Sequence, residues 1–515
     1  MFVTIILATL ICLGVCYVLS KFWHRSFIKK INTLPGPKTY PFIGNVLYFF
    51  RIKTTEIIQV TNTLVNDFSS PLRVWFGNTA YIAVYDGEQI KAVLQSRCFE
   101  KSSLYNIFKS TLKTGLVTSP VSLWSLHRKV VEKFLTPNNL RVHSNIFVEQ
   151  SLAFMNELEK VEKDGNEIIF LDFVYKHILD SALVIMLGVK MESQLINRIY
   201  KCTTSIREIW KCRISNLLFH SNVLFNLSTI KWRQQKQLNC LNLLVNEMEQ
   251  MRHAFDKRVA TKTNSETVLF DILLEACHNG RLTQQEFWDH MITMSLAATD
   301  TTAITINFVI FMLANFPEVQ EKAYKELSEI YGIESPKSVP IKYNDLQHMN
   351  YLNRVIKETM RLFPAIPFIG RILTEDVKIG ETILPKGADT IMSIFHMHRN
   401  KKHWSNPLMF DPDRFLPEKE GHCSKYFMPF SNGRRNCIGK HEQITKYDKI
   451  ALYIINKIAG QKYAMISMKV ILITLIRTFE FKVDKNIKIE DIELNTDIAL
   501  CTVDPLKVKI QKRDY

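Results

Sequence analysis

The sequence is poor in residues that break or crosslink a chain. Its 515 residues include only 17 glycines, 17 prolines and 10 cysteines, and 47% are hydrophobic. This composition excludes a fibrous or disordered protein. The cysteines show no CxxC spacing and no regular pattern, so a disulfide framework is not expected and a reducing compartment is favoured. No Ser/Gly/Pro-rich linker interrupts the chain after residue 45, which favours one large domain.

Acidic residues are the minority among the charges. There are 66 Lys+Arg against 50 Asp+Glu, a formal net charge of +16. Such a charge can attract nucleic acid, anionic lipid or an acidic protein partner. Nucleic acid is the weakest of these three, because the basic residues are scattered and no zinc-finger spacing, RNA-binding signature or long basic tract accompanies them.

Charged side chains are missing from residues 1–20, and residues 2–19 are almost wholly apolar. That length can cross a hydrocarbon core of about 30 Å. Lys21, His24 and Arg25 follow the apolar run, which by the positive-inside rule keeps the downstream chain cytoplasmic. A cleaved signal peptide is the alternative, but it needs a positive segment before a shorter apolar core. We expect a membrane anchor at 1–20, a basic, Pro/Gly-rich hinge at 21–45 and a catalytic domain at 46–515.

Strand signals are few, and helical periodicity dominates. Residues 72–85 alternate β-branched and aromatic side chains around Gly77-Asn78, which predicts a hairpin. Residues 86–362 are mostly helical by spacing, and strand-like segments follow, including 376–383 and 502–510. The longest expected helix, 283–315, carries Asp300 as its single charge after His290, so it should be buried. A second membrane span is the alternative, which the hydroxyl-rich middle disfavours. The fold class is mainly α with a minor β part.

One cysteine stands in a specific pattern near the C-terminus. Residues 430–439 read FSNGRRNCIG, which matches F-x-x-G-x-R-x-C-x-G. This spacing resembles the haem-ligand loop of the cytochrome P450 superfamily. A thiolate that binds haem iron must stay ionised, receive backbone N–H donors and be sheltered from water. Gly433 and Gly439 permit a tight loop, Phe430 can cover the sulfur of Cys437, and Arg435 is placed to meet a haem propionate. A buried structural thiol is the alternative for a lone cysteine.

Two further motifs stand in the order that the family requires. Glu358 and Arg361 lie at i and i+3 of a helix, and Arg414 follows in FDPDRF. By resemblance these three form a buried triad that locks the segment behind the cysteine loop. The resemblance also implies that Trp124, Arg128 and Arg371 contact the haem propionates. On the long helix it implies that Asp300 is an acid that delivers protons and that Thr301 is an alcohol that holds dioxygen.

The run from 358 to 418 looks most like family 4, or clan 4, which is abundant in insects. Many members carry a Glu that esterifies the haem; here that position is Ala297, so we expect haem b held non-covalently apart from the bond between the Cys437 thiolate and iron. A sharper departure follows Gly439, where residues 440–460 separate CIG from QKYA, which are continuous in the family. We interpret these 21 residues as translated intron, with a genuine inserted loop as the alternative.

The resemblance implies a membrane-anchored haem-thiolate monooxygenase on the cytoplasmic face of the endoplasmic reticulum. NADPH-cytochrome P450 reductase, with cytochrome b5 as a second donor, would supply electrons, because this chain has no flavin or nucleotide fingerprint. A basic face with Lys129, Lys133 and Arg434 would meet the reductase. The substrate would be O₂ with a fatty acid, terpenoid, hormone or xenobiotic, and apolar residues 216–219 and 223–225 would lie near membrane lipid. The alternatives are a haem-thiolate isomerase or dehydratase, which the Asp300-Thr301 pair disfavours, and a non-catalytic haem-binding protein, if residues 440–460 disable the loop.

Overall fold

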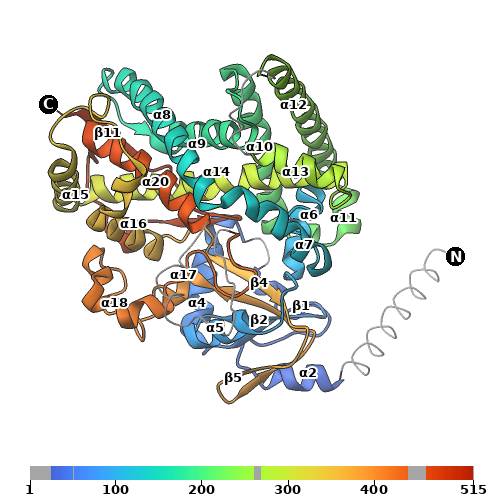
Figure 1. Cartoon of the computed structure of the whole chain (residues 1–515). Coiled ribbons are helices and arrows are strands. Elements are labelled where there is room, and N and C mark those ends of the chain that lie inside the picture. The colour runs from blue at the N-terminus through green and yellow to red at the C-terminus, as the bar shows by residue number, and fades with distance from the viewer. Residues whose placement is uncertain (1–24, 50–51, 260–267, 439–459, 514–515) are drawn as a thin grey trace, which may run out of the picture.

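The computed structural model describes residues 25–49, 52–259, 268–438 and 460–513. The expected anchor at 1–20, Gly439 and residues 440–459 lie outside them. Helices dominate the described chain, and the strands are short (Figure 1). The predicted fold class, mainly α with a minor β part, is therefore confirmed.

The helices keep the labels of Figure 1. The N-terminal half contains α2 (Arg25–Asn32), α3 (Val46–Phe49), α4 (Ile57–Asp67), α5 (Gly87–Gln95), α6 (Asn106–Leu112), α7 (Val121–Glu132), α8 (Pro137–Glu162), α9 (Phe170–Leu187), α10 (Ser193–Ser215), α11 (Asn222–Asn226) and α12 (Thr229–Val259). The C-terminal half contains α13 (Leu269–His278), α14 (Gln284–Asn315), α15 (Pro317–Tyr331), α16 (Asn350–Leu362), α17 (Ile394–Met397), α18 (Pro417–Cys423) and α20 (Gly460–Thr478).

The longest helix, α14, runs through the middle of the helical part (Figure 1). It begins with a capping box in which the Thr283 hydroxyl accepts from the Glu286 backbone N–H, and the Glu286 carboxylate accepts from the Thr283 N–H. Within the described residues it is the one helix long and apolar enough to cross a membrane, and 78% of its most apolar window is buried inside the protein. It is covered by α9, α13, α16 and α20. Because α14 is apolar nearly all round, the sequence predicted a buried helix here, and the structure confirms it.

Within the described residues, the strands form four small sheets. They are β1 (Leu72–Phe76), β2 (Thr79–Val84), β3 (Ile168–Ile169), β4 (Phe368–Ile372), β5 (Val377–Ile379), β6 (Thr382–Leu384), β7 (Asp389–Ser393), β8 (Phe479–Lys482), β9 (Leu494–Thr496), β10 (Leu500–Thr502) and β11 (Lys507–Lys512). The largest sheet has the order β1-β2-β7-β4, with β2 and β7 parallel and the other pairs antiparallel.

The predicted hairpin and the predicted strand-like segments are present. β1 and β2 pair with Val74 opposite Tyr81, and Gly77 in the turn has φ of 59°, a conformation that glycine adopts without strain. The segment 376–383 forms the β5-β6 hairpin, and 502–510 contains the end of β10 and the start of β11. The four-stranded sheet matters for the site, because β4 carries Arg371 toward the cysteine loop.

Candidate functional site

The cysteine loop is closed by its own backbone. The Cys437 N–H donates to the Phe430 carbonyl at 3.1 Å, and the Asn436 N–H donates to the Gly433 carbonyl at 3.3 Å. Gly433 has φ of 74°, and a Cβ built there would lie 2.0 Å from the Leu94 carbonyl oxygen, so this position requires glycine. The Cys437 side chain is exposed, which leaves its sulfur accessible to a ligand. Phe430 is half-buried beside this loop.

Three guanidinium groups lie together at this loop, one from the loop itself and two from distant parts of the chain. Arg435 donates to the carbonyls of Phe99, at 2.7 Å, and Ser119. Arg371 of β4 donates to the Arg435 carbonyl at 3.1 Å. Burial, and then the positive charge of Arg371, lower the pKa of Arg435 to about 10. The cysteine loop is thus tied to the sheet and to the segment before α7.

Helix α7 supplies the third guanidinium. Arg128 donates to the Asn436 carbonyl at 3.0 Å and to the Asn436 side-chain oxygen at 3.1 Å, and it pairs with Glu132 one turn later at 2.7 Å. Trp124 lies one turn earlier, with the Arg128 guanidinium 5.6 Å and the Arg435 guanidinium 5.1 Å from its ring centroid. The structure therefore brings together Trp124, Arg128, Arg371 and Arg435 beside Cys437.

The structure also brings Glu358, Arg361 and Arg414 together. Glu358 and Arg361 on α16 are fully buried, and the two Glu358 oxygens each accept from Arg361 at 2.7 Å. The Arg414 Nε donates to Glu358 at 3.2 Å. The remaining guanidinium hydrogens of both arginines donate to backbone carbonyls of residues 398–409. This cluster fastens the segment that precedes the cysteine loop onto α16.

Asp300 and Thr301 are neighbours on α14, but their side chains have different partners. The Asp300 carboxylate accepts from the Tyr175 hydroxyl of α9 at 2.5 Å and lies 3.7 Å from the Arg207 guanidinium of α10. Burial raises the pKa of Asp300, while Arg207 and Tyr175 oppose that rise. The Thr301 hydroxyl donates to the Ala297 carbonyl at 2.9 Å. In this structure the acid is therefore held by α9 and α10 rather than by the alcohol.

Comparison of the sequence with known proteins identifies the family. A family model described as Cytochrome P450 matches residues 34–441, about four-fifths of the chain. The chain belongs to the cytochrome P450 family. Cytochrome P450 4c21 of Blattella germanica is 29% identical and the match covers 96% of both chains. Cytochrome P450 4V2 of Mus musculus is 28% identical over 94% of this chain and 91% of the relative.

A third relative, "Cytochrome P450 4e5, mitochondrial" of Drosophila mettleri, is 30% identical over 89% of this chain and 86% of that relative. The predicted resemblance to P450 family 4 is thereby confirmed. The protein is a cytochrome P450 monooxygenase, which uses O₂, a small-molecule substrate and a redox partner. Proteins of this family bind haem b through a cysteine thiolate, as the sequence predicted.

The residues beside Cys437 fit this cofactor. Arg371 and Arg435 are buried, yet no carboxylate of the described chain lies within ion-pair distance of either. The Arg435 Nε is buried without a hydrogen-bond acceptor among the described residues. Buried cations of this kind are costly unless an anion pairs with them. The two propionate carboxylates of haem b have the charge that this cluster lacks.

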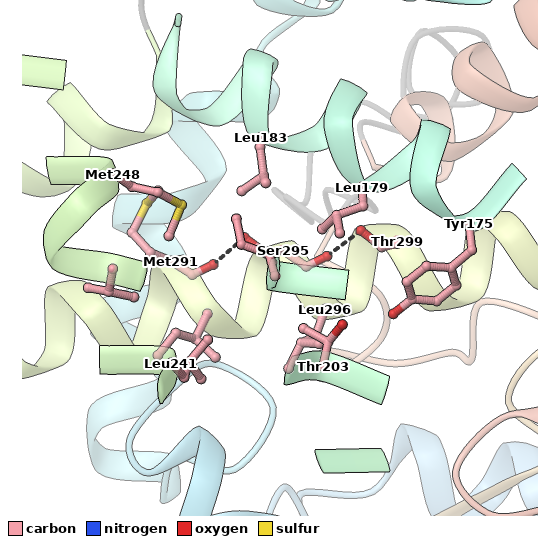
Figure 2. A pocket seen from close by; sticks show the side chains of 13 residues that line it. Tyr175, Leu179, Leu183, Thr203, Leu241, Met248, Met291, Ser295, Leu296 and Thr299 are labelled. Atoms are coloured by element: carbon pink, nitrogen blue, oxygen red, sulfur yellow. Dashed lines mark hydrogen bonds between the residues drawn. The ribbon is translucent and has the colours of Figure 1, made fainter. Parts of the chain in front are cut away.

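A small cavity of about 30 Å³ lies elsewhere, between α9, α10, α12 and α14 (Figure 2). Its wall on α14 includes Met291, Ser295 and Thr299. The Ser295 hydroxyl donates to the Met291 carbonyl, and the Thr299 hydroxyl donates to the Ser295 carbonyl. At about 100° per residue, Thr301 projects roughly 200° away from Thr299. The cavity therefore lies on the opposite face of α14 from Thr301. Of the two residues that hold the Asp300 carboxylate, Tyr175 and Arg207, Tyr175 also lines the cavity.

Sequence reasoning missed Tyr175, Arg207 and the backbone acceptors of Arg435. Tyr175 and Arg207 precede Asp300 by about a hundred residues and belong to no motif. The carbonyls of Phe99 and Ser119 carry no signal in the sequence, because any residue type supplies the same acceptor.

Proposed function

We propose that this P450 is a membrane-anchored haem-thiolate monooxygenase that inserts one oxygen atom into a lipophilic substrate. The observation that carries the proposal is the convergence of Arg128, Arg371 and Arg435 on the loop of Cys437. These cations come from α7, from β4 and from the loop itself, so the arrangement depends on the whole fold.

The residues of the site divide into the iron ligand, Cys437, and the side chains that bind the propionates. Cys437 ligates the iron as a thiolate, and its backbone turn is fixed by Phe430 and Gly433. The four residues that bind the propionates are Trp124, Arg128, Arg371 and Arg435. Haem supplies the chemistry that reductively splits dioxygen, with one atom inserted into a C–H or C=C bond and the other leaving as water. Gly439 lies outside the described residues, and the bend proposed for it rests on the sequence alone.

The proton-transfer role falls to Asp300. It is an acid beside the Thr301 position on α14, and burial raises the pKa of its carboxyl above the ordinary value, which favours the protonated form that can donate. Because Tyr175 and Arg207 hold its carboxylate, a change of its hydrogen-bond partners must precede proton delivery toward Thr301. Thr301 then holds the oxygen substrate through its hydroxyl, which in this structure is engaged with Ala297.

Electrons would come from NADPH-cytochrome P450 reductase, with cytochrome b5 as a second donor. Lys129, Lys133 and Arg434 are exposed, while their neighbours are buried: Arg128 donates to Asn436 of the cysteine loop, and Arg435 donates to the Phe99 carbonyl. This places positive charge at the surface directly outside the loop, which suits an acidic partner.

Membrane lipid and a lipophilic substrate fit the exposed apolar side chains. Leu218, Val223 and Leu227, between α10 and α12, and Trp232, in the first turn of α12, are 62 to 82% exposed. Exposed apolar residues gathered in one short segment mark a membrane or partner surface. With the apolar run at 2–19, they support anchoring to the endoplasmic reticulum with the catalytic domain facing the cytoplasm.

Residues 440–460 decide whether the chain as written is active. The family match ends at residue 441, just inside this segment, and α20 begins with Gly460, directly before the QKYA sequence. We infer that translated intron separates the cysteine loop from α20. The rival, a non-catalytic haem-binding protein, applies if the segment belongs to the functional protein and disables the loop.

The test expresses the full chain and a form lacking 440–460 in microsomes with reductase. A carbon monoxide difference band near 450 nm followed by NADPH consumption with fatty acids, terpenoids or xenobiotics supports the monooxygenase. Haem binding without NADPH consumption in both forms supports the non-catalytic rival. Product formation without NADPH or reductase supports the isomerase or dehydratase. Sequencing the mature transcript tests the intron, which is refuted if 440–460 is present in the dominant message.

A further inference from the structure

Two cysteines that no motif singled out meet between α10 and α12, which pack against each other (Figure 1). Cys202 of α10 is 2% exposed, and its thiol donates to the Gln237 carbonyl of α12 at 3.4 Å. Gln237 precedes Cys240 by three residues, about one helical turn, so the Cys202 sulfur lies against the turn that ends at Cys240. Cys240 is half-buried, and both cysteines are free thiols in this structure.

The packing of the two helices fixes this meeting. Arg198, one turn before Cys202 on α10, pairs at 2.9 Å with Glu247, which follows Cys240 on α12. The helices therefore run antiparallel, with the two cysteines at neighbouring positions of the same interface. Helices pack with axes about 8–10 Å apart and carry Cα atoms at a radius of about 2.3 Å, so facing Cα atoms come as close as a disulfide requires.

The two thiols differ in their access to solvent. Burial, and then the Cys240 thiol, raise the pKa of Cys202 to about 12. Cys202 therefore stays protonated near neutral pH, and the protein interior shields it. Cys240 is the accessible member of the pair, so an oxidant arriving from solvent meets Cys240 first.

We propose that Cys202 and Cys240 form a reversible disulfide, which joins α10 to α12, when the protein meets hydrogen peroxide. This oxidant is the two-electron reduction product of the O₂ that the family uses. The Cys240 thiolate attacks peroxide, so that an S–O bond forms, the O–O bond breaks and the leaving hydroxide takes up the thiol proton as water. The Cys202 sulfur then attacks the sulfenic acid at Cys240, so that the S–S bond forms, the S–O bond breaks and a second water leaves with the Cys202 proton.

The atoms and electrons of these two steps balance. Two thiols and one hydrogen peroxide become one disulfide and two waters. The two sulfur atoms together lose two electrons, which reduce the peroxide. A small thiol such as glutathione reverses the reaction by exchange, and in doing so it becomes oxidised.

The bridge would lie directly behind the wall of the small cavity. Thr203 and Leu241, the residues that follow the two cysteines, both line this cavity (Figure 2). Its volume of about 30 Å³ has room for very few water molecules, so an organic molecule can enter only if the helical wall opens. The disulfide holds two of the wall helices together, and its reduction releases them.

The first experiment detects the bridge itself. The full chain, purified in detergent and reduced, is treated with hydrogen peroxide, and catalase stops the reaction. The remaining thiols are alkylated, and a tryptic digest is analysed by mass spectrometry without reductant. Trypsin releases the cysteines in residues 202–207 and 237–252, with one cysteine in each peptide. Most wild-type chains should give the two peptides joined, with two hydrogen atoms fewer than the separate peptides, and dithiothreitol should separate them.

The second experiment measures whether the bridge restrains the helices. Backbone amides of α10 and α12 in the oxidised wild type should exchange with deuterium about five- to tenfold more slowly than in the reduced protein, because openings that separate the helices are suppressed. Amides of α16, which carries neither cysteine, should exchange at the same rate in both forms.

Three variants complete the design. Cys240→Ser should give no joined peptide and no change in exchange on oxidation. Cys202→Ser should behave in the same way, and its hydroxyl can still donate to Gln237; if this buried position does not tolerate serine, the half-buried Cys240 supplies the same test. Cys212→Ser is the matched control, because Cys212 is a half-buried cysteine of α10 beside Arg233, and this variant should form the bridge as the wild type does.

Each outcome decides the proposal. It is overturned if peroxide converts Cys240 to a sulfinic acid without a joined peptide, or if Cys240 joins Cys212 instead. A joined peptide with unchanged deuterium exchange also overturns it, because the bridge would then not restrain the helices. Since the bridge needs only the two thiols and the packing of α10 on α12, it does not rest on the proposed function. A chain that forms the bridge but gives no carbon monoxide band near 450 nm supports the bridge and contradicts the monooxygenase.

Discussion

Outside the cysteine loop, substitution of Glu358 is expected to lower the stability of the protein more than any other single change. Its carboxylate accepts four hydrogen bonds, two from Arg361 at 2.7 Å, one from Arg414 at 3.2 Å and one from the Asp411 N–H at 3.0 Å. Both guanidinium groups are buried, and neither forms an ion pair with a second carboxylate among the residues that the structure describes. Glu358→Ala would leave two positive charges in the interior without their counterion.

Breaking a buried ion pair in this way costs about 3–5 kcal/mol. For 515 residues, an unfolding entropy near 2.1 cal/mol/K per residue gives about 1.1 kcal/mol/K in total. The variant should therefore melt about 3–5 °C lower. The assay is thermal unfolding of the haem-loaded full chain, followed by circular dichroism and by the Soret band, at one scan rate for all variants.

Glu329→Ala is the matched control, because Glu329 is exposed on α15, and it should shift the melting temperature by less than about 0.5 °C. Glu358→Gln keeps the shape and two hydrogen-bonding atoms but not the charge, so it should fall between the two. A Glu358→Ala shift as small as that of the control would refute the reasoning, because it would mean that water reaches both guanidinium groups.

Two other changes test the site, and a third tests the packing of α9 at His177. Cys437→Ser should abolish the 450 nm carbon monoxide band, since a serine hydroxyl is not ionised near neutral pH; a normal band in this variant would refute the assignment of the iron ligand. Asp300→Asn should lower product formation by about a hundredfold while haem content stays unchanged, because an amide cannot deliver a proton; equal activity would show that another group does so. Burial lowers the pKa of His177 to about 3, below its ordinary 6.5, so the stability that neutral His177 contributes is present above pH 6.5 and is lost as the pH falls toward 3. At pH 5 the stability lost is about 2 kcal/mol. His177→Phe preserves stacking on Phe154 but cannot be protonated. Between pH 7 and pH 5, its free energy of unfolding in urea should therefore fall by about 2 kcal/mol less than that of the wild type.

The sequence could predict the helices, turns and motifs that depend on residues close together in the chain. The β1-β2 hairpin follows from alternation around Gly77-Asn78, and α14 follows from an apolar run with a capping box at Thr283. The cysteine loop was recognisable because the iron ligand, the glycine at positive φ and the arginine must stand at fixed spacing. In such cases the physical requirement lies within a few neighbouring residues.

What could not be predicted depends on contacts between distant segments. Cys202 and Cys240 stand in no motif, and their meeting cannot be seen until the packing of α10 against α12 is known. The pairing of Asp300 and Thr301 in the sequence suggested that acid and alcohol act side by side. The structure instead gives Asp300 partners on α9 and α10, because successive helix positions point about 100° apart.

This arrangement links the acid to α9 and α10, which border the small cavity beside α14. Tyr175 and Arg207 lie on α9 and α10, and α10 leads directly into the exposed apolar segment around Leu218 and Val223. A substrate that moved α10 would change the distance between Arg207 and Asp300, and hence the pKa of the acid. Removing Arg207 would raise that pKa, since its charge is the largest influence opposing burial. The step that depends on ionised Asp300 should then need a higher pH in Arg207→Leu than in the wild type, whereas Arg207→Lys should restore the original pH profile of product formation. An unchanged profile in Arg207→Leu would mean that the contact between α10 and Asp300 does not control the acid.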